Sequence, residues 1–150
     1  MATKFSQSWI ISSEADLKLF SEKLVPHLSA PLIIGLHGEM GSGKTTFVRC
    51  LATVLGSPDW VNSPTYAIIQ SYTSPKFELL HLDLYRAQNE QDIDHLDIPS
   101  LMTNQHLVLI EWINKTTLFN VDLLVEFNVV GEQRKITLSS DQLSWVSTLK

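Results

Sequence analysis

The chain has 150 residues, of which 44% are hydrophobic and 18% are charged. This length and composition are typical of a soluble globular protein and predict one domain, residues 1–150, that is large enough to bury a core. The formal net charge is −5, and the 11 lysine and arginine residues form no cluster. Because a protein that holds RNA or DNA by itself usually shows a basic face, we expect any role with nucleic acid to act through a partner.

The sequence shows neither a membrane segment nor a disulfide framework. Its longest apolar runs, such as residues 121–129, are interrupted by charge, and its first residues lack the apolar run of a secretory signal. Cys50 is the only cysteine, which excludes a framework of disulfides. We therefore predict no membrane association and a location in the reducing cytoplasm.

The first part of the chain carries signals for two strands and two helices. Residues 5–11 predict a short strand, and SEAD at residues 13–16 has the form of a capping box at the start of a helix. The apolar residues that follow recur at helical spacing: Leu17, Phe20, Leu24 and Leu28. The unbroken apolar run of residues 32–36 is typical of a buried parallel strand, and a helix is predicted over residues 44–55, ended by Gly56.

The middle of the chain alternates between strand-like runs and turns. Residues 66–73 and 77–84 predict two strands around a tight turn at residues 74–76. The acidic stretch over residues 88–98 predicts a short helix, and the apolar residues 106–110 predict a second buried strand.

Near the end of the chain, residues 121–129 and 134–138 alternate between apolar and polar positions around Gly131, which predicts a second hairpin. Residues from Asp141 onward predict a short amphipathic helix. Buried strands that alternate with helices predict an α/β fold, in which a central, mostly parallel sheet is flanked by helices and extended by antiparallel hairpins.

The stretch GEMGSGKTT at residues 38–46 meets the pattern of a phosphate-binding loop, G-x-x-x-x-G-K-[ST]. Its three glycines let the backbone turn N–H groups toward phosphate oxygens, and the helix N-terminus behind them favours anions. In such a loop Lys44 reaches the β- and γ-phosphates, and the Thr45 hydroxyl is a ligand of Mg²⁺. We therefore predict nucleotide binding by the residues of this loop: Gly38, Glu39, Met40, Gly41, Ser42, Gly43, Lys44, Thr45 and Thr46.

A phosphate-binding loop needs an acidic side chain at the end of another strand to hold Mg²⁺ and to orient the attacking water. Glu111 ends the apolar run HLVLIE, and Asp83 lies at the end of another strand-like run, in HLDLYR. Since ligands bind outside the carboxyl ends of parallel strands, both acids are candidate metal ligands and candidate catalytic residues beside Lys44. Two alternatives stay open: that only one of them contacts the metal, or that each simply ends a strand facing solvent.

Two further residues allow more than one interpretation. Trp112 is expected in the core, with a lid over the nucleotide site or a contact surface as alternatives. Thr65 in NSPTY resembles a switch threonine that senses the γ-phosphate, and it fits equally well at the start of a strand. The five histidines, at positions 27, 37, 81, 95 and 106, lack the spacing of a metal site, so zinc is not expected.

The residues that accompany the loop narrow its class. NKTT at residues 114–117 begins like the guanine-binding element N-K-x-D but ends in Thr117, which has no carboxylate, and no D-x-x-G follows the loop. A GTPase switch is therefore not predicted. A small-molecule kinase needs an arginine-rich lid, whereas this chain offers only Arg86 and Arg134 beyond the loop helix. A kinase and a nucleotide-binding scaffold without turnover remain as alternatives to an ATPase.

Four motifs in order make the chain resemble the TsaE family over about residues 13–113: GEMGSGKTT, SPTY, HLDLYR and IEW. That family is the small bacterial P-loop ATPase needed to make threonylcarbamoyladenosine in tRNA. The resemblance implies a P-loop NTPase fold, with ATP and Mg²⁺ as ligands. It also implies partnership with the TsaD–TsaB pair, which performs the carbamoyl transfer, so that tRNA is met only indirectly through the complex.

The resemblance also implies roles for residues of the matched motifs. It makes Thr45 and Glu111 ligands of Mg²⁺, wraps the phosphates in residues 41–46, and makes Asp83 and Trp112 essential to activity.

Three further implications concern residues around the loop. The resemblance places Thr65 in a switch-like loop, brings Ser13 and Glu14 to the adenine side, and brings Arg134 toward the nucleotide. The chain departs from the family's more usual aspartate, leucine, alanine and proline at Glu39, Met40, Ser42 and Ile113.

The resulting hypothesis is an ATPase whose binding and hydrolysis of ATP change how it docks on the TsaD–TsaB pair, resetting the pair between cycles. The chain alone is expected to hydrolyse ATP slowly, because no second arginine is well placed to act in cis.

Overall fold

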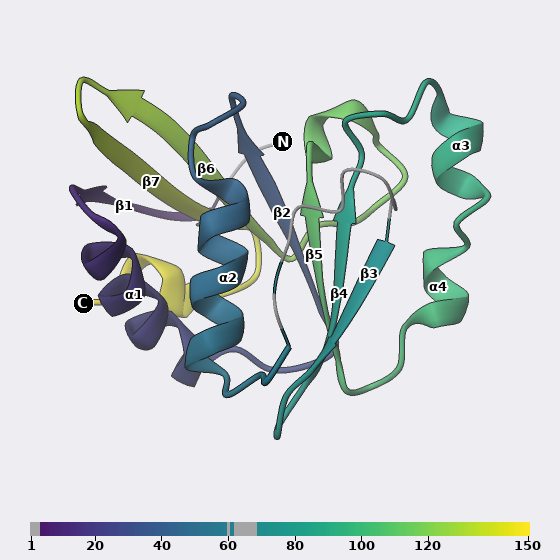
Figure 1. The fold of residues 1–150 in the computed structure, drawn as a ribbon, viewed down its shortest axis with the longest axis horizontal. Coiled ribbons are helices and arrows are strands. Elements are labelled where there is room, and N and C mark those ends of the chain that lie inside the picture. Colours follow the sequence, from purple (N-terminus) through teal and green to yellow (C-terminus); the bar gives the residue numbers. More distant parts are fainter. Residues whose placement is uncertain (1–3, 60, 62–68) are drawn as a thin grey trace.

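The computed structural model describes residues 4–59, 61 and 69–150, which form a seven-stranded sheet flanked by helices (Figure 1). The strands are β1 (Phe5–Ile11), β2 (Leu32–Gly38), β3 (Ile69–Thr73), β4 (Glu78–Asp83), β5 (His106–Glu111), β6 (Leu123–Val130) and β7 (Gln133–Ser140). The α-helices are α1 (Glu14–Leu24), α2 (Lys44–Val54), α3 (Glu90–Asp94) and α4 (Ile98–Leu101). Three short 3₁₀ helices complete the set: η1 (Val25–His27), η2 (Ile113–Lys115) and η3 (Ser144–Ser147).

The centre of the sheet is parallel and its edges are antiparallel. The strand order is β1-β7-β6-β2-β5-β4-β3, and the pairs β6–β2, β2–β5 and β5–β4 run parallel. The strands β3, β7 and β1 each pair antiparallel with their neighbours. This arrangement confirms the predicted α/β fold with a mostly parallel central sheet and antiparallel hairpin additions. It also brings the carboxyl ends of β2, β4 and β5 to one edge of the sheet, at the top of Figure 1.

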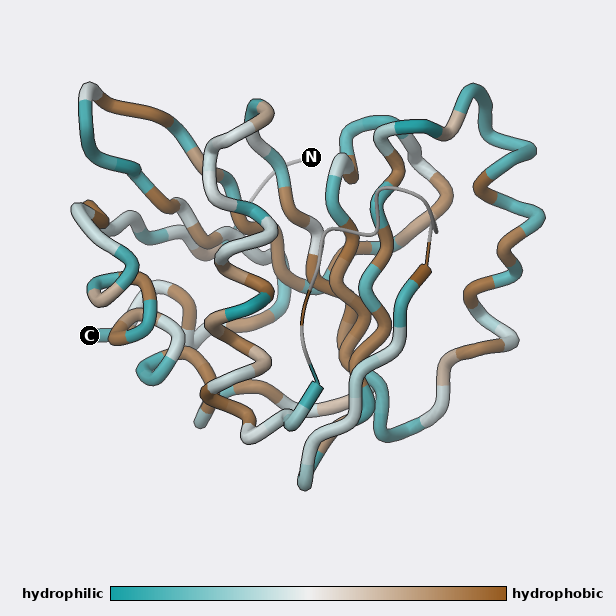
Figure 2. Tube along the Cα trace, in the orientation of Figure 1, coloured by the Kyte–Doolittle hydropathy of each residue, from teal (hydrophilic) through white to brown (hydrophobic). Residues whose placement is uncertain are grey.

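Helices cover both faces of this sheet, and the strand residues alternate between them. Along β4 and β5, Leu79, Leu107 and Leu109 belong to the core that also holds α1 and α2. Their neighbours Leu80 and Val108 belong to the second core, which holds α3, α4 and η2. Figure 2 shows the resulting band of apolar residues through the central strands. Because both faces are covered, these strands read as unbroken apolar runs, as expected of a buried parallel sheet.

The start of α1 follows the predicted cap with one difference. The hydroxyl of Ser13 accepts a hydrogen bond from the N–H of Asp16 at 3.1 Å, as predicted. The carboxylate of Asp16, however, accepts from the N–H of Ser12 at 3.0 Å, one residue before the cap. Leu28 is buried as predicted, but it lies beyond the helix, which ends at Leu24 ahead of Pro26.

Two predicted helices are wrong in detail. The acidic stretch forms two short helices, because Pro99 has no N–H with which to continue a helix. Pro99 instead lies in the first turn of α4, and Asp97 before that helix has a left-handed backbone (φ 47°). The tail forms only the 3₁₀ helix η3, where the hydroxyl of Ser140 accepts from the N–H groups of Gln142 and Leu143 and so turns the chain.

The remaining element predictions hold where the structure describes them. The strand predicted over residues 66–73 is found from Ile69 onward, and its first residues lie outside the described part of the chain. No helix in the described residues is both long enough and apolar enough to cross a membrane.

Phe47 joins α2 to the rest of the core and generates a prediction of stability. Its side chain is fully buried, and its ring lies 6.1 Å from that of Phe20 in α1 and 5.7 Å from that of Phe127 in β6. We expect Phe47→Ala to lower the free energy of unfolding by about 3–5 kcal/mol, because it leaves a cavity between two elements. Urea denaturation would measure this.

The matched control is Leu19→Ala on the exposed side of α1, where the leucine is 56% exposed. It should change stability by less than about 0.5 kcal/mol. Equal losses in the two variants would contradict this account of the core.

Candidate nucleotide site

The loop between β2 and α2 has the backbone geometry that its glycines predict. Gly41 and Gly43 have positive φ, 79° and 111°, which is costly for any residue with a Cβ. Gly38 is needed for another reason, because a Cβ there would lie 2.6 Å from the Ser42 hydroxyl and 2.8 Å from the carbonyl oxygen of Phe127. Gly43 is the N-cap of α2 and provides no side-chain cap. The first N–H groups of α2 therefore have no intrahelical partner, which makes this end an anion-binding position.

Lys44 is held at the centre of the loop. Its Nζ donates to the carbonyl oxygens of Gly38 and, at 3.0 Å, Glu39, and it lies 4.3 Å from the centre of the Trp112 ring. Burial lowers the pKa of Lys44, while the nearby carboxylates of Glu111 and Asp83 oppose that shift. The ammonium group thus stands between the loop and two acidic strand ends, where it can meet a phosphate.

Glu111 reaches the loop from the end of β5. Its two carboxylate oxygens each lie 3.1 Å from the hydroxyl of Thr45, the second residue of α2. The carboxylate is 3% exposed, so the alternative that Glu111 ends a strand facing solvent is wrong. Parallel pairing sets Leu36 of β2 opposite Glu111, which places the acid beside the start of the loop.

Asp83 ends β4 directly beside Glu111, its register partner in the sheet. The side chain is half-buried and accepts a hydrogen bond from the N–H of Tyr85 at 2.9 Å. Burial raises the pKa of Asp83; the Tyr85 N–H opposes this shift, and the neighbouring Glu111 carboxylate adds to it. A carboxyl group with a raised pKa beside a second acid is suited to exchange protons with water.

Trp112 lies at the edge of the second core, against which its partly buried side chain packs, and it also covers the phosphate side of the site. It has a left-handed backbone (φ 62°), which is rare for a bulky residue and turns the chain sharply after Glu111. Its ring is partly buried, packs 5.1 Å from that of Tyr85, and covers Lys44. Of the three interpretations offered by the sequence, its position over Lys44 favours the lid.

These side chains surround a cavity of about 440 Å³ that faces α2. Its lining includes Lys44, Thr45, Asp83, Glu111 and Trp112, together with Met40, Tyr85 and Arg86 at the rim. Arg86 thus stands at the rim of this cavity, and the expectation that no second arginine is well placed to act in cis stays a prediction.

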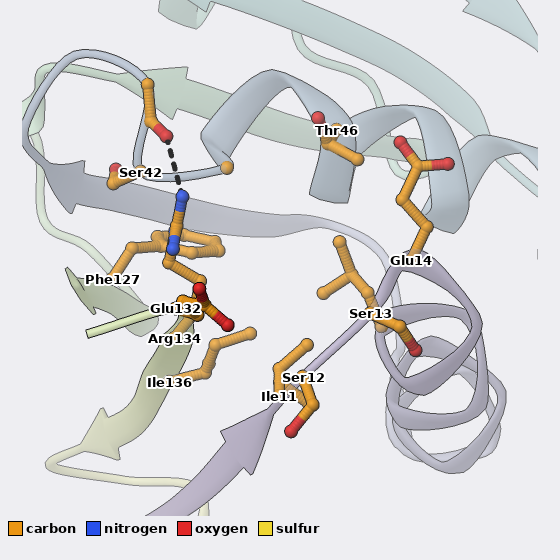
Figure 3. Close-up of a pocket in the computed structure, with 13 residues that line it drawn as sticks. Ile11, Ser12, Ser13, Glu14, Ser42, Thr46, Phe127, Glu132, Arg134 and Ile136 are labelled. Carbon is orange, nitrogen blue, oxygen red and sulfur yellow. Dashed lines mark hydrogen bonds between the residues drawn. The ribbon is translucent and has the colours of Figure 1, made fainter. Parts of the chain in front are cut away.

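A second cavity, of about 250 Å³, shares Gly41, Gly43 and Thr46 with the first (Figure 3). Its apolar lining consists of Ile11, Leu17, Phe127 and Ile136, and its polar lining includes Ser13, Glu14, Glu132 and Arg134. The guanidinium of Arg134 reaches across to the carbonyl oxygen of Gly41 at 3.5 Å, the outer limit of a hydrogen bond. Arg134 is distant in sequence from Ser13 and Glu14, yet all three line this cavity beside the loop.

The structure therefore gathers nearly all the predicted site residues around the two cavities. Thr65 lies outside the described residues. Gly38 and Glu39 line a separate hollow with His37 and Glu126, and only their carbonyl oxygens, which accept from Lys44, tie them to the site.

His81 also belongs to the site, although its sequence spacing did not predict this: its Nε2 lies 2.5 Å from Glu111 Oε2. A signal was available: His81 is two residues before Asp83 in a strand, so the two share a face.

The oxygen atoms present fit Mg²⁺. This ion takes oxygen ligands, keeps several waters, and is usually held by one or two protein side chains together with phosphates. The hydroxyl of Thr45 and the carboxylate of Glu111 converge at the helix N-terminus, and Asp83 lies next to them. Within the described residues, no group of three or more His, Cys, Asp or Glu side chains forms a cage for a metal. The donor set suits an ion that arrives with a phosphate-bearing ligand.

A buried parallel strand, a glycine-rich loop that opens a helix, and an acid on the adjacent strand define a P-loop NTPase fold. Known proteins agree with this class. The model of the family described as "Threonylcarbamoyl adenosine biosynthesis protein TsaE" matches residues 11–138.

Two relatives carry the name tRNA threonylcarbamoyladenosine biosynthesis protein TsaE. That of Aquifex aeolicus is 31% identical over 128 residues, covering 84% of this chain and 90% of the relative. That of Borreliella burgdorferi is 33% identical over 135 residues, covering 85% and 95%. The crystal structure of Bacillus subtilis YdiB has the same fold, with a TM-score of 0.72 at 20% identity over 99% of this chain and 95% of that one. The chain belongs to the TsaE family, which is named for the biosynthesis of threonylcarbamoyladenosine in tRNA.

The raised pKa of Asp83 generates a pH prediction. The folded state binds this proton more tightly than the unfolded chain, whose carboxyl has the ordinary pKa of 3.8. Ionisation therefore costs stability as the pH rises through the folded pKa, and Asp83→Asn avoids that cost while keeping an acceptor for Tyr85. We expect the free energy of unfolding of D83N to rise relative to that of the wild type as the pH rises above 3.8, the ordinary pKa of the carboxyl in the unfolded chain.

Urea denaturation at several pH values would measure the gap between the two proteins. D141N, at an exposed carboxyl, controls for the loss of one negative charge. A gap that shrinks as the pH rises would contradict the assigned shift.

Proposed function

We propose that this protein binds ATP with Mg²⁺ and hydrolyses it slowly, in support of threonylcarbamoyladenosine formation on tRNA. The observation that carries the proposal is the convergence of Lys44, Thr45, Glu111 and Asp83 on one cavity beside the loop. Membership in the TsaE family supports the biological process, and the geometry of the site supports the proposed binding and hydrolysis of ATP.

Each residue has a defined part in the proposed reaction. The amide groups of the loop and the Lys44 ammonium bind the phosphates, and Thr45 and Glu111 hold Mg²⁺. When bound, Mg²⁺ would withdraw charge from the phosphate oxygens as a Lewis acid. Asp83 is half-buried beside Glu111, where it can orient a water molecule and accept its proton.

The cavity with the apolar lining is proposed to hold the adenine base. Aliphatic side chains and the ring of Phe127 offer the faces on which a purine packs, and polar groups at the rim can fix its orientation. Since the two cavities share Gly41, Gly43 and Thr46, one nucleotide can place its base in the apolar cavity and its phosphates in the cavity around Lys44.

The proposed partners are the TsaD and TsaB proteins, with tRNA bound by them. The phosphate cavity has an exposed rim, where Met40 is 70% exposed and Tyr85 is 46% exposed. A site that is open to water stabilises developing charge less well than a closed one. Docking of a partner over this rim would exclude water and accelerate hydrolysis, whereas the isolated chain would remain slow.

A first test of the proposed function concerns the binding of ATP. Lys44→Ala removes the ammonium that meets the phosphates, a charge-assisted hydrogen bond worth about 1.5–3 kcal/mol, so the affinity for ATP should fall about 10- to 100-fold. Isothermal titration calorimetry would measure it. Lys76→Ala, in the exposed turn between β3 and β4, should leave the affinity unchanged; equal losses in both variants would refute the assigned site.

The second prediction concerns turnover. Phosphate release from ATP by the chain alone should be slow and should rise at least about tenfold when TsaD and TsaB are added, since closure of the site strengthens its electrostatics. Glu111→Gln keeps the shape of the side chain but removes its charge, and it should abolish the stimulated release while ATP still binds. A rate that TsaD and TsaB leave unchanged would count against the partnership.

A further inference from the structure

His81 is the one buried imidazole in contact with the acid end of β5. Its side chain is 0% exposed and lies in the apolar run of β4, on the same face as Leu79 and Asp83. Its Nε2 lies 2.5 Å from Oε2 of Glu111, which is itself nearly fully buried. A polar pair placed so deeply is costly unless its hydrogen bonds are made.

The hydrogen bonds fix how His81 is oriented. An ionised carboxylate can only accept, so the proton between the two groups belongs to Nε2 of His81. The opposite ring nitrogen, Nδ1, lies 3.3 Å from the hydroxyl of Tyr72 on β3, and that hydroxyl donates to the Gln70 side chain at 2.6 Å. Because the single proton of the Tyr72 hydroxyl goes to Gln70, the Nε2–H bond to Glu111 is what orients the ring, and Tyr72 packs beside it with the ring centroids 6.0 Å apart.

This arrangement constrains the carboxylate of Glu111. Oxygen Oε2 accepts hydrogen bonds from Nε2 of His81 and from the Thr45 hydroxyl, whereas Oε1 accepts one from the Thr45 hydroxyl alone. Because a fully buried imidazole holds Oε2, rotation of the carboxylate about its last bond is restrained, and the Thr45 hydroxyl is the partner of Oε1. A carboxylate without this partner could rotate about its last bond.

We propose that His81 is a positioning residue for Glu111: its Nε2–H holds one carboxylate oxygen, so that the carboxylate presents the geometry in which a divalent cation binds beside Thr45. The inference rests on the proposed function, because it concerns the residues that would hold Mg²⁺. Hydrogen-bond partners of metal-binding side chains set the orientation of those side chains, and their loss typically costs 10- to 100-fold in metal affinity.

Two substitutions of His81 separate its two ring nitrogens. His81→Gln can place an amide N–H where Nε2 stands and so keep the donor to Glu111. His81→Asn is shorter, places its amide near the position of Nδ1, and loses that donor. His95→Asn, at an exposed histidine of the acidic segment, is the matched control for the same chemical change.

The experiment measures the affinity for ADP by calorimetry, first in EDTA and then at increasing Mg²⁺ concentrations. Mg²⁺ is expected to increase the affinity for ADP, and the quantity compared is the Mg²⁺ concentration that gives half of this increase. We expect H81N to raise that concentration about tenfold or more. Its affinity for ADP in EDTA should stay within about twofold of that of the wild type. H81Q should restore the requirement to within about threefold, and H95N should not change it. A requirement unchanged in H81N would overturn the inference, as would equal losses of affinity in EDTA and in Mg²⁺.

A second measurement needs no variant of His81. In the wild-type protein, the ¹⁵N resonances of the His81 ring should shift on addition of Mg²⁺ and ADP more than on addition of ADP in EDTA, and E111Q should shift them without any ligand. Resonances that respond to neither change would overturn the inference even if the His81 variants do not fold. Failure of the proposed function gives a different result, because a wild-type protein that binds no ADP would contradict that function. Mg²⁺-dependent binding of ADP that H81N leaves intact would contradict only the role of His81.

Discussion

The hydroxyl of Thr45 lies 3.1 Å from both carboxylate oxygens of Glu111, and the other features of the site depend on that approach. It requires β2 and β5 to be parallel and adjacent, so that their carboxyl ends lie together. It also requires the chain to pass from β2 into α2 through a very tight loop. Gly38 makes this possible, since any Cβ at that position would collide with Ser42 and with the backbone of Phe127. The fold therefore places a helix N-terminus and an acid within reach of the same ligand.

The strands that form the core also form the site, and one face of the sheet does both. Along β5, Leu107 and Leu109 pack under α1 and α2, and Glu111, the next residue on that face, enters the cavity. Along β4, Leu79 belongs to the same core, whereas His81 and Asp83 are polar. Side chains on one face of a strand recur every second residue, so a core layer can pass into a site layer without any change of direction. The buried core residues of β4 and β5 thus position the polar residues at the carboxyl ends of these strands.

Local pattern predicted the parts of the protein that are encoded locally. The loop glycines, the buried runs before Glu111 and Asp83, and the cap at Ser13 each follow from a few neighbouring residues. The approach of Arg134 to the Ser13 turn cannot be predicted in this way, because it results from the antiparallel pairing of β1 with β7, which sets Ile11 opposite Arg134 although the two strands are far apart in the sequence. The resemblance to TsaE implies only that Ser13 and Arg134 each lie near the nucleotide. The left-handed backbone of Trp112, whose ring contacts Tyr85 and Lys44, is likewise not indicated by any propensity of tryptophan. The spacing of His81 to the other histidines carries no signal of a site; its place in the strand alternation, two residues before Asp83, does.

The charges around the phosphate cavity give the proposed function a selectivity of its own. Two carboxylates, Asp83 and Glu111, stand beside the position proposed for the phosphates, in a chain with a net charge of −5. Coulomb repulsion makes that environment unfavourable for a bare nucleotide, and the buried Lys44 offsets it only in part. A divalent cation bound to the phosphates reverses the sign of the interaction with both acids. The same carboxylates that would disfavour free ATP therefore favour its magnesium complex, and a fixed orientation of Glu111 sharpens that preference, because the attraction between a carboxylate and a cation depends on the distance of closest approach.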